Sequence, residues 1–273
     1  MTADSLGQNK TLKVLQFTDT HFFKDPSHKL LGVETSSSFA EVYKAASLSH
    51  GTPDFYLLTG DLSQDETEES YRRLAEAMHA ADAPCYFLPG NHDRRQEMES
   101  GLIFPESHFK LDRQVIKGNW QIILLDSLVE GEVGGHLDGN ELKFLQNCLE
   151  RRRELHALVC LHHHPVPMGA HWLDQIGVDN GSEFMRLISE FESVKGVLWG
   201  HVHQEFNAMH NDVSLMATPS TCVQFKTRSK DFGVDPVPPG FRWLELDPDG
   251  KIRSAVRRTD RVALGLELSS AGY

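Results

Sequence analysis

Six short apolar runs recur along this sequence, and they restrict its fold more than any other feature. Each run is too short for a typical helix and is bounded by turn-forming residues, so each predicts a β-strand. The predicted strands are Leu12–Phe17, Phe55–Leu58, Cys85–Leu88, Ile122–Leu125, Ala157–Leu161 and Val194–Trp199. Segments with helical character lie between them, and strands that alternate with helices predict an α/β sandwich.

Four helices are predicted, because the segments concerned combine good helix formers with helical spacing and nearby capping residues. They are Phe39–Leu48, Thr67–Ala81, Asn140–Arg153 and Glu183–Phe191. The first of them follows four candidate N-cap residues at positions 35–38, and the third follows Asp138-Gly139. These signals predict where the two helices begin.

The last third of the chain has a different pattern, with two predicted hairpins. One turns at Asn211-Asp212 and the other at Asp247-Pro248-Asp249-Gly250. Two late hairpins suggest a second sheet that faces the first. Lys226–Gly240 is rich in Pro, Gly and charge, and we expect it to form an ordered loop or lid.

Residues that bind metal ions follow five of the six apolar runs. The five motifs are Asp19-Thr20-His21, Gly60-Asp61, Gly90-Asn91-His92-Asp93, His162-His163-His164 and Gly200-His201-Val202-His203. Because the carboxyl ends of strands in an open α/β sheet share one crevice, we expect these groups to converge. Asp and His without thiolates suit borderline divalent ions such as Zn, Mn and Fe. A carboxylate can bridge two ions, and Asp61 is placed for that role.

Taken one at a time, the motifs also have ordinary structural explanations. Asp19-x-His21 and Gly60-Asp61 are common in turns and caps, and Gly90–Asp93 is compatible with an Asx-turn followed by an N-cap. The triple His is compatible with a solvated strand end. However, all five motifs occur in this order, and each follows a predicted strand. One shared metal site explains this better than five separate structural roles.

Composition and charge exclude several classes of function. The chain carries 27 Lys and Arg against 39 Asp and Glu, a formal charge of −12, which is unfavourable for binding a nucleic acid polymer or an anionic membrane. No apolar run approaches the roughly 20 residues of a membrane span, and the first ten residues lack the apolar stretch of a signal peptide. We therefore expect a cytoplasmic protein. Its four cysteines form no CxxC pair and are expected to be buried thiols.

The organisation of the chain points to one domain. We find no internal repeat, low-complexity tract or linker, so residues 1–273 are predicted to be a single domain with a flexible N-terminus at 1–11 and a tail at 261–273. The oligomeric state stays open between a monomer and a homodimer.

The five motifs together resemble the calcineurin-like metallophosphoesterases. Longer stretches resemble one group within that superfamily, the bacterial class III 3′,5′-cyclic AMP phosphodiesterases. These stretches are Leu30–Val33, Gly60–Asp65, Ala83–Asp93, His162–Pro165 with Trp172–Asp174, and Ala217–Lys226. The resemblance implies a four-layer α/β/β/α sandwich of the metallo-dependent phosphatase type, with a two-metal site between the sheets.

The resemblance also implies a set of ligands. One ion would be held by Asp19, His21, Asp61 and His203, and the other by Asp61, Asn91, His162 and His201, with Asp61 shared. The downstream Pro165 and Pro167 align so that the first His of the triplet is the ligand. On an extended chain His163 would point away, while His164 would share the face of His162 and is a candidate donor behind the ligands. The residues expected to bind the cofactor are His21, Asp61, Asn91, His92, His162 and His203.

The activity that the resemblance implies is hydrolysis of 3′,5′-cyclic AMP to 5′-AMP, which lowers cyclic AMP signalling. The cofactors would be two divalent ions, with Fe²⁺ or Mn²⁺ preferred and Zn²⁺, Co²⁺ or Mg²⁺ as alternatives. His92 is expected to stabilise charge on the departing 3′ oxygen or to protonate it. Asp93 is expected to orient His92, with a supporting or N-cap role as the alternative.

Three questions stay open at this point. Phe22, Phe23, Trp172 and Phe225 are candidates for stacking on the adenine, but core or lid packing explains each of them as well. A metallophosphoesterase of the same fold that acts on a phosphoprotein or another nucleotide is the main alternative function. A nucleotide-sensing protein that has lost catalysis is the other, although every expected ligand is present.

Overall fold

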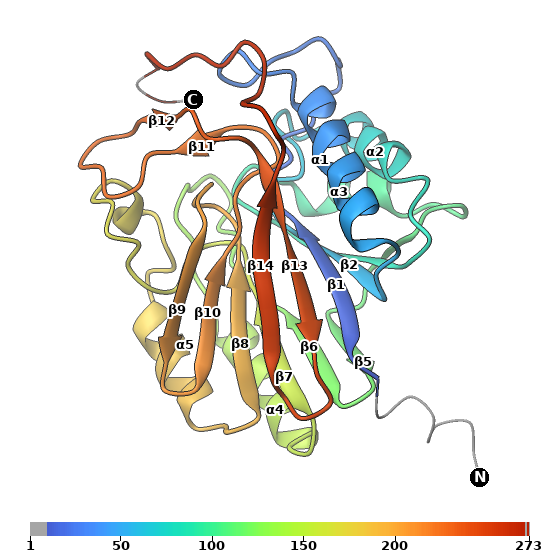
Figure 1. Cartoon of the computed structure of the whole chain (residues 1–273). Coiled ribbons are helices and arrows are strands. Elements are labelled where there is room, and N and C mark those ends of the chain that lie inside the picture. The colour runs from blue at the N-terminus through green and yellow to red at the C-terminus, as the bar shows by residue number, and fades with distance from the viewer. Residues whose placement is uncertain (1–9, 271, 273) are drawn as a thin grey trace.

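In the computed structural model, which describes residues 10–270 and 272, the predicted strands lie in two six-stranded sheets (Figure 1). The first sheet has the order β14-β13-β1-β2-β3-β4, and the second has the order β5-β6-β7-β8-β10-β9. The strands of the first sheet are β1 Leu12–Phe17, β2 Phe55–Thr59, β3 Cys85–Leu88, β4 Phe109–Lys110, β13 Gly240–Leu246 and β14 Ile252–Arg258. Those of the second are β5 Gln114–Lys117, β6 Trp120–Leu124, β7 His156–Cys160, β8 Val194–Trp199, β9 Phe206–His210 and β10 Val213–Ala217.

The parallel centre of each sheet comes from the six predicted runs. β1, β2 and β3 are parallel neighbours in the first sheet, and β6, β7 and β8 are parallel neighbours in the second. Both predicted hairpins form, but the expectation that they build the second sheet is wrong. β13 and β14 extend the first sheet beside β1, whereas β9 and β10 extend the second beside β8. Each hairpin therefore lengthens a sheet that already has a parallel centre.

The four predicted helices are present, with a fifth that the sequence pattern did not indicate. Their bounds are α1 Thr35–His50, α2 Glu68–Ala77, α3 Arg95–Leu102, α4 Gly139–Arg151 and α5 Gly181–Ser189. Asp138 caps α4 as predicted, because its carboxylate accepts bonds from the N–H groups of Asn140 and Glu141. The unpredicted α3 is only eight residues long and has no side-chain cap at its N-terminus, so it lacks the usual start signal.

Alternation along the strands produces the four-layer α/β/β/α arrangement, which confirms the predicted fold class. In β7, Ala157 and Val159 pack with residues of α4 and α5, while Leu158 and Cys160 pack with residues of the other sheet. The first sheet packs in the same way on α1, α2 and α3 (Figure 1). Three apolar layers therefore separate the four layers of backbone, and burial of this area drives the assembly.

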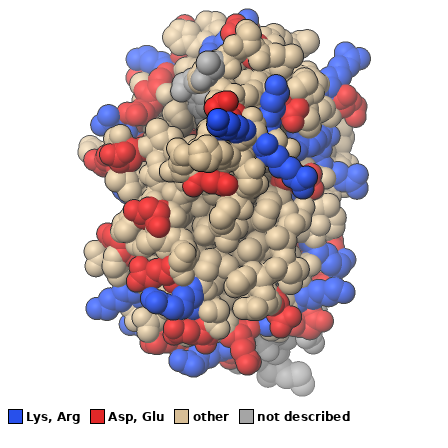
Figure 2. Space-filling view, turned by 90° about the vertical axis from the view of Figure 1, so that its left-hand side faces the viewer, with Lys and Arg blue, Asp and Glu red and all other residues tan. Residues whose placement is uncertain are grey.

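The thiols and one side of the surface can be compared with the sequence. All four cysteines are buried and unpaired. None of the helices in the described part of the chain combines the length and hydropathy that a membrane-spanning segment needs. The side of the molecule that carries β9 mixes basic and acidic side chains around an uncharged centre (Figure 2). That side therefore offers no continuous basic surface to a nucleic acid polymer.

The predicted ordered loop and the two termini have different outcomes. Within Lys226–Gly240, β12 Val234–Asp235 pairs with β11 Gln224–Phe225, so the segment is ordered as expected. Most of the predicted flexible N-terminus, residues 1–9, lies outside the described residues. The C-terminal tail packs beside the start of α1, where the N–H of Glu267 donates to the carbonyl of Leu31 at 2.9 Å.

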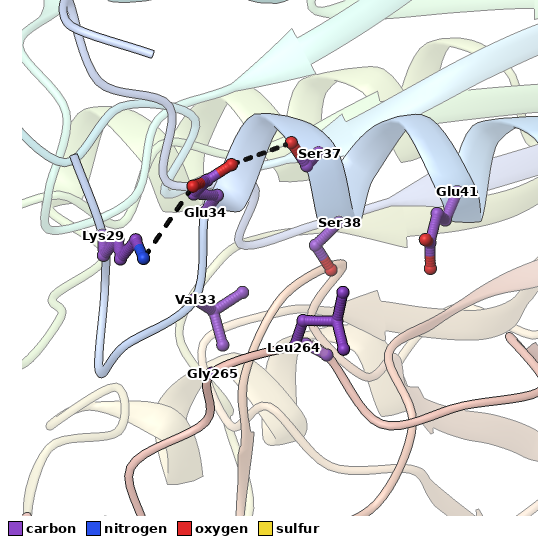
Figure 3. Close-up of a pocket in the computed structure, with 9 residues that line it drawn as sticks. Lys29, Val33, Glu34, Ser37, Ser38, Glu41, Leu264 and Gly265 are labelled. Carbon is purple, nitrogen blue, oxygen red and sulfur yellow. Dashed lines mark hydrogen bonds and ion pairs between the residues drawn. The ribbon is translucent and has the colours of Figure 1, made fainter. Parts of the chain in front are cut away.

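A hollow of about 270 Å³ lies between α1 and this tail (Figure 3). Lys29 forms an ion pair with Glu34 across part of it, and Glu34 also accepts a bond from the hydroxyl of Ser37. None of the predicted metal ligands lines this hollow. It is therefore separate from the site that the five motifs predict.

Candidate dinuclear metal centre

The fold brings the five motifs together at one end of the two sheets. Asp19 and His21 follow β1, Asp61 follows β2 and Asn91 follows β3, all in the first sheet. His162 follows β7, and His201 and His203 follow β8, all in the second sheet. Because both sets of parallel strands end at the same place, the seven predicted ligands meet between the sheets.

The first predicted ligand set forms one compact group. Asp19, His21, Asp61 and His203 each place a ligand atom within 4.8 Å of the others, and all four are buried. Nε2 of His203 lies 3.4 Å from Oδ1 of Asp19 and 3.3 Å from Nε2 of His21. Nε2 of His21 lies 3.9 Å from Oδ2 of Asp61. The group has the size and donor types of a metal site.

The second predicted set shares Asp61 with the first. Nε2 of His162 lies 3.3 Å from Oδ2 of Asp61 and 3.3 Å from Oδ1 of Asn91. The ring of His201 lies 5.1 Å from the ring of His162, centroid to centroid. Asp61 therefore stands between the two groups, as a bridging carboxylate requires.

The hydrogen bonds of three imidazoles fix their Nδ1 atoms on the side away from the cluster. Nδ1 of His162 donates to the Thr59 carbonyl at 2.7 Å, and Nδ1 of His203 donates to the Val223 carbonyl at 2.9 Å. Nδ1 of His21 donates to Oε1 of Gln64 at 2.7 Å. In the neutral ring each Nε2 then carries a lone pair that faces the cluster, which is the usual orientation of metal-binding histidines. Sequence reasoning missed these three acceptors. Two of them are backbone carbonyls, which no residue type marks, and the third is the side chain of Gln64.

The triple His has a different role for each member. His163 also lies near His162 and His201, but its ring is already bonded to the Ser127 hydroxyl at 2.8 Å and the Val133 carbonyl at 3.2 Å. Its ring nitrogens are therefore engaged by the structure, but the expectation that His163 points away is wrong, because one of these nitrogens lies within 4.8 Å of those of His162 and His201. The expected donor role of His164 stays a prediction. Among the described residues its ring nitrogens have no hydrogen-bond partner, and the ring stacks on His201 at 5.6 Å.

One buried nitrogen provides an independent test of the fit to a metal. Nε2 of His201 has no hydrogen-bond partner in the described part of the chain. A buried polar atom without a partner costs about 1–3 kcal/mol, and an imidazole nitrogen gains that energy back by binding a metal ion. Together with the lone pairs turned toward Asp19 and Asp61, this donor set fits two borderline divalent ions.

Five of the seven predicted ligands have an unusual backbone conformation. The φ angles of Asp19, His21, Asp61, His201 and His203 lie between 46° and 64°, in the left-handed region that L-residues rarely adopt. Such positions cost about 1–3 kcal/mol each and cluster at functional sites. The strand ends are therefore bent so that consecutive ligands turn into the cluster, which no side-chain pattern reveals.

Glycines next to the ligands provide space as well as flexibility. A Cβ on Gly90 would lie 2.2 Å from Oδ1 of Asp61, and one on Gly200 would lie 2.0 Å from the hydroxyl of Thr18. Gly60 has a φ of 88°, and a Cβ there would meet the ring of His162 at 2.4 Å. Of the three, only Gly60 has the conformation that requires glycine for its backbone.

Buried hydroxyls fix the carbonyls of the ligand loops. The hydroxyl of Thr35 donates to the His21 carbonyl at 2.8 Å, and that of Ser220 donates to the Asp19 carbonyl at 2.7 Å. Thr35 was expected to be an N-cap candidate for α1, but the N-cap of α1 is Glu34. The expectation of a cap at 35–38 is therefore wrong, and the hydroxyl of Thr35 supports the site instead.

Asp93 holds two of the ligand loops together. Its carboxylate accepts bonds from the N–H groups of Leu62, Ser63 and Gly90 at 2.8–3.1 Å, and from the Tyr71 hydroxyl at 3.0 Å. The N-cap alternative is wrong, because the N-cap position of α3 is Arg94, the next residue along the chain. Asp93 thus ties the loop of Asp61 to the loop that carries Asn91, while its orientation of His92 stays a prediction.

The electrostatics of the cluster are dominated by Asp61. Burial opposes its charged form, but His162 and the other nearby imidazoles hold the pKa of Asp61 well below its usual range. Burial lowers the pKa of His162, yet the neighbouring Asp61 outweighs this and raises it to about 9. Burial and the proximity of Asp61 raise the pKa of Asp93 to about 7. The shared carboxylate is therefore the main anionic charge at the centre of the site.

His92 lies at the open side of the cluster. Its backbone N–H donates to Oδ1 of Asp61 at 2.9 Å, which fixes the residue beside the shared ligand. Its ring is 5.2 Å from the ring of His21, and the residue is partly exposed, unlike the buried histidines around it. His92 is thus accessible to a small molecule that approaches the cluster.

The aromatic candidates divide into two kinds. Phe22 and Phe225 are buried, and Phe225 stacks on the ring of His203 at 4.0 Å. Packing therefore explains these two side chains, and Phe225 supports a ligand directly. Phe23 and Trp172 are only partly buried, so they are the two of the four that have surface to offer a ligand.

Comparison with known proteins places the fold and the site in one class. Residues 12–205 match the family described as calcineurin-like phosphoesterase, so the chain belongs to that family. A dimetal phosphatase from Danio rerio has the same fold, with a TM-score of 0.61 at 11% identity over 91% of this chain and 99% of that one.

Relatives from bacteria are much more similar. The chain is 40% identical to the protein named 3′,5′-cyclic adenosine monophosphate phosphodiesterase CpdA of Vibrio vulnificus, over 100% of this chain and 98% of the relative. The protein of the same name from Escherichia coli K12 is 40% identical over 96% of this chain and 95% of its own length. That of Pseudomonas aeruginosa is 37% identical over 95% and 94%.

Proposed function

We propose that this chain hydrolyses 3′,5′-cyclic AMP to 5′-AMP at a site that holds two divalent metal ions, and thereby lowers cyclic AMP signalling. The observation that carries the proposal is two adjacent buried clusters of Asp and His, with Asn91 beside His162, in a chain about 40% identical over 96–100% of its length to proteins named CpdA. In the reaction, water adds across the bond between phosphorus and the 3′ oxygen, and the 3′ oxygen leaves with a proton.

The ligands of the two ions are part of this proposal. Asp19, His21, Asp61 and His203 would hold one ion, and Asp61, Asn91, His162 and His201 would hold the other. Two divalent ions, when bound, outweigh the charge of Asp19 and Asp61, stabilise the charge of the phosphate and lower the pKa of water. The two proposed ions are Fe²⁺ or Mn²⁺, since carboxylate, amide and imidazole donors suit both metals.

His92 would act on the leaving group. It is held beside Asp61 by its backbone N–H and stands at the open side of the cluster, where a bound cyclic nucleotide would meet it. From this place its imidazole can donate a proton to the departing 3′ oxygen, which typically accelerates a reaction by about 10²–10⁴-fold. Asp93 would act indirectly, by keeping the loops of Asp61 and Asn91 in register.

The remaining parts of the proposal concern partners and location. All seven proposed ligands come from one chain, so the site is complete in a monomer, and a homodimer would carry two independent sites. We place the protein in the cytoplasm, where cyclic AMP is produced, with no nucleic acid polymer or membrane as its partner.

The test is a turnover assay with Mn²⁺-loaded protein and cyclic AMP, followed by chromatography of 5′-AMP. We expect the wild type to release 5′-AMP, chelator to abolish the release, and His92→Ala and Asn91→Ala to reduce it steeply. His79→Ala is the matched control, because His79 is an exposed histidine away from the cluster, and it should leave turnover unchanged.

Two results would contradict the proposal in different ways. If cyclic AMP is not hydrolysed but an aryl phosphate ester is, the site is an active phosphoesterase with another substrate. If no phosphoester is hydrolysed although Mn²⁺ binds, the chain is a nucleotide-sensing protein.

A further inference from the structure

A layer of buried polar side chains lies between the two sheets, just below the metal ligands. On the faces that meet between the sheets, β1 and β13 carry apolar residues away from the site, Val14 and Leu244 among them. Two positions closer to the site the same faces of these two strands become polar, with Gln16 after Val14 and Arg242 before Leu244. The members of this polar layer are Gln16, Thr59, Thr218 and Arg242, which are all 0% exposed.

Arg242 is the only charged member of the polar layer, and its hydrogen bonds go to neutral groups. Its guanidinium donates to the carbonyls of Ala217 and Phe206 at 2.7 and 3.2 Å, both in the second sheet. It also donates to the side chains of Asn207, Ser254 and Thr218 at 3.0–3.1 Å. No carboxylate of the described residues forms an ion pair with it. A buried cation is costly, so a role beyond packing is expected of it.

A chain of hydrogen bonds leads from Arg242 to a proposed metal ligand. The hydroxyl of Thr218 accepts from Nε of Arg242 and donates to Oε1 of Gln16. Nε2 of Gln16 donates to the Thr59 hydroxyl at 2.7 Å and to the Trp199 carbonyl at 3.3 Å. The carbonyl of the same Thr59 accepts from Nδ1 of His162, and Trp199 directly precedes Gly200-His201. The series of hydrogen bonds from Arg242 therefore reaches the strand ends that carry His162 and His201.

The guanidinium sets the direction of this chain. Arginine has donors and no acceptor, so the Thr218 oxygen must accept from it and must give its own proton to Gln16. The amide of Gln16 is then turned with its NH₂ toward Thr59 and Trp199. An apolar or accepting side chain at 242 would remove this constraint and release the amide to flip.

We propose that Arg242 is a positioning residue for the metal centre, which orders the polar layer and thereby holds the strand ends of His162 and His201 at the right distance from Asp61. The proposal rests on the proposed function, because it assigns these two histidines as ligands. In this role Arg242 touches neither the substrate nor the metal ions. Its effect should therefore appear in metal affinity rather than only in stability.

The experiment measures Mn²⁺ binding by titration calorimetry, without cyclic AMP, together with the thermal midpoint of the metal-free protein. We expect Arg242→Met to weaken the binding of Mn²⁺ by about 10-fold, at the lower end of the effect of residues that orient ligands. Arg242→Lys, which keeps the charge but loses the planar fork, should recover part of this loss. Thr218→Val breaks the chain one step later and should weaken Mn²⁺ binding by a similar factor.

Leu244→Ala is the matched control, since Leu244 lies on the same face of β13 as Arg242 but packs among apolar residues. It should lower the thermal midpoint and leave Mn²⁺ affinity within twofold. The double variant of Arg242→Met and Thr218→Val should bind Mn²⁺ no more weakly than either single variant, because both substitutions interrupt the same series of hydrogen bonds.

The proposal is overturned if Arg242→Met binds Mn²⁺ as the wild type does, or if Leu244→Ala weakens binding equally. Should Arg242→Met fail to fold, Thr218→Val decides the question by the same criterion. A wild type that binds Mn²⁺ but does not hydrolyse cyclic AMP contradicts the proposed function and leaves this test intact.

Discussion

The two ends of the layer between the sheets have the same geometry and opposite chemistry. At one end Val14, Leu57 and Leu244 pack in an apolar core, and at the other Gln16, Thr59 and Arg242 take the next positions on the same faces of the same strands. The apolar end contributes stability in proportion to the area it buries. The polar end contributes little net stability, because its bonds replace bonds to water, but those bonds have direction. The difference teaches that in this fold the apolar half of the layer holds the sheets together, and the polar half sets the positions of the ligands.

The largest expected effect comes from Asp61→Asn, at the tip of the polar end. The amide cannot serve as an anionic bridge between two ions, so we expect no detectable hydrolysis of cyclic AMP and a stoichiometry below two Mn²⁺ per chain. Titration calorimetry and the 5′-AMP assay check this. A variant that still binds two ions with unchanged affinity would show that Asp61 is not the shared ligand.

His92→Ala should reduce kcat by about 10²–10⁴-fold, the range typical of general acid catalysis. Because His92 is not among the proposed ligands, the binding of Mn²⁺ should stay within twofold of the wild type. The separation of these two readouts distinguishes a residue that acts on the leaving group from one that holds metal. A parallel loss of Mn²⁺ affinity would assign His92 to the ligand set instead.

Leu57→Ala tests the apolar end on β2. Leu57 is buried between the sheets, so its truncation should lower the free energy of unfolding by about 2–5 kcal/mol through lost burial and a cavity. Urea denaturation of the metal-free protein measures this. The Mn²⁺ affinity of the folded variant should not change by more than twofold, and a large change would mean that the two ends are not separable.

Thr59→Val is the corresponding change two residues later on the same strand. It keeps the shape of the side chain and the carbonyl that binds His162, but it removes the acceptor for Gln16. We expect a smaller loss of about 1–3 kcal/mol, the cost of a buried donor without its partner. A weaker binding of Mn²⁺ should accompany it, in contrast to Leu57→Ala. The same two measurements on both variants decide whether the comparison holds.

Much of this structure was predictable, since short-range patterns specify it. The six apolar runs mark the parallel strands to within two residues, and the residues that follow them meet as expected. The predictions failed where a feature depends on what lies across the fold. The late hairpins divide between the two sheets, and the hydroxyl of Thr35 bonds to the His21 carbonyl instead of capping a helix. An eight-residue helix without a side-chain cap also left no pattern to detect.

The order of motifs along the chain was enough to specify the strands, the layers and the chemical types of the ligands, because alternation and residue type are local properties. Tertiary structure alone decided how those ligands are held. The backbone at Asp61 and His201 is left-handed. The carbonyls that accept from Nδ1 of His162 and His203 lie on other segments of the chain. The hydrogen bonds from Arg242 to Thr59 also connect segments that are distant in sequence. Backbone groups carry no sequence signal, and a hydrogen bond depends on a distance that only the folded chain sets.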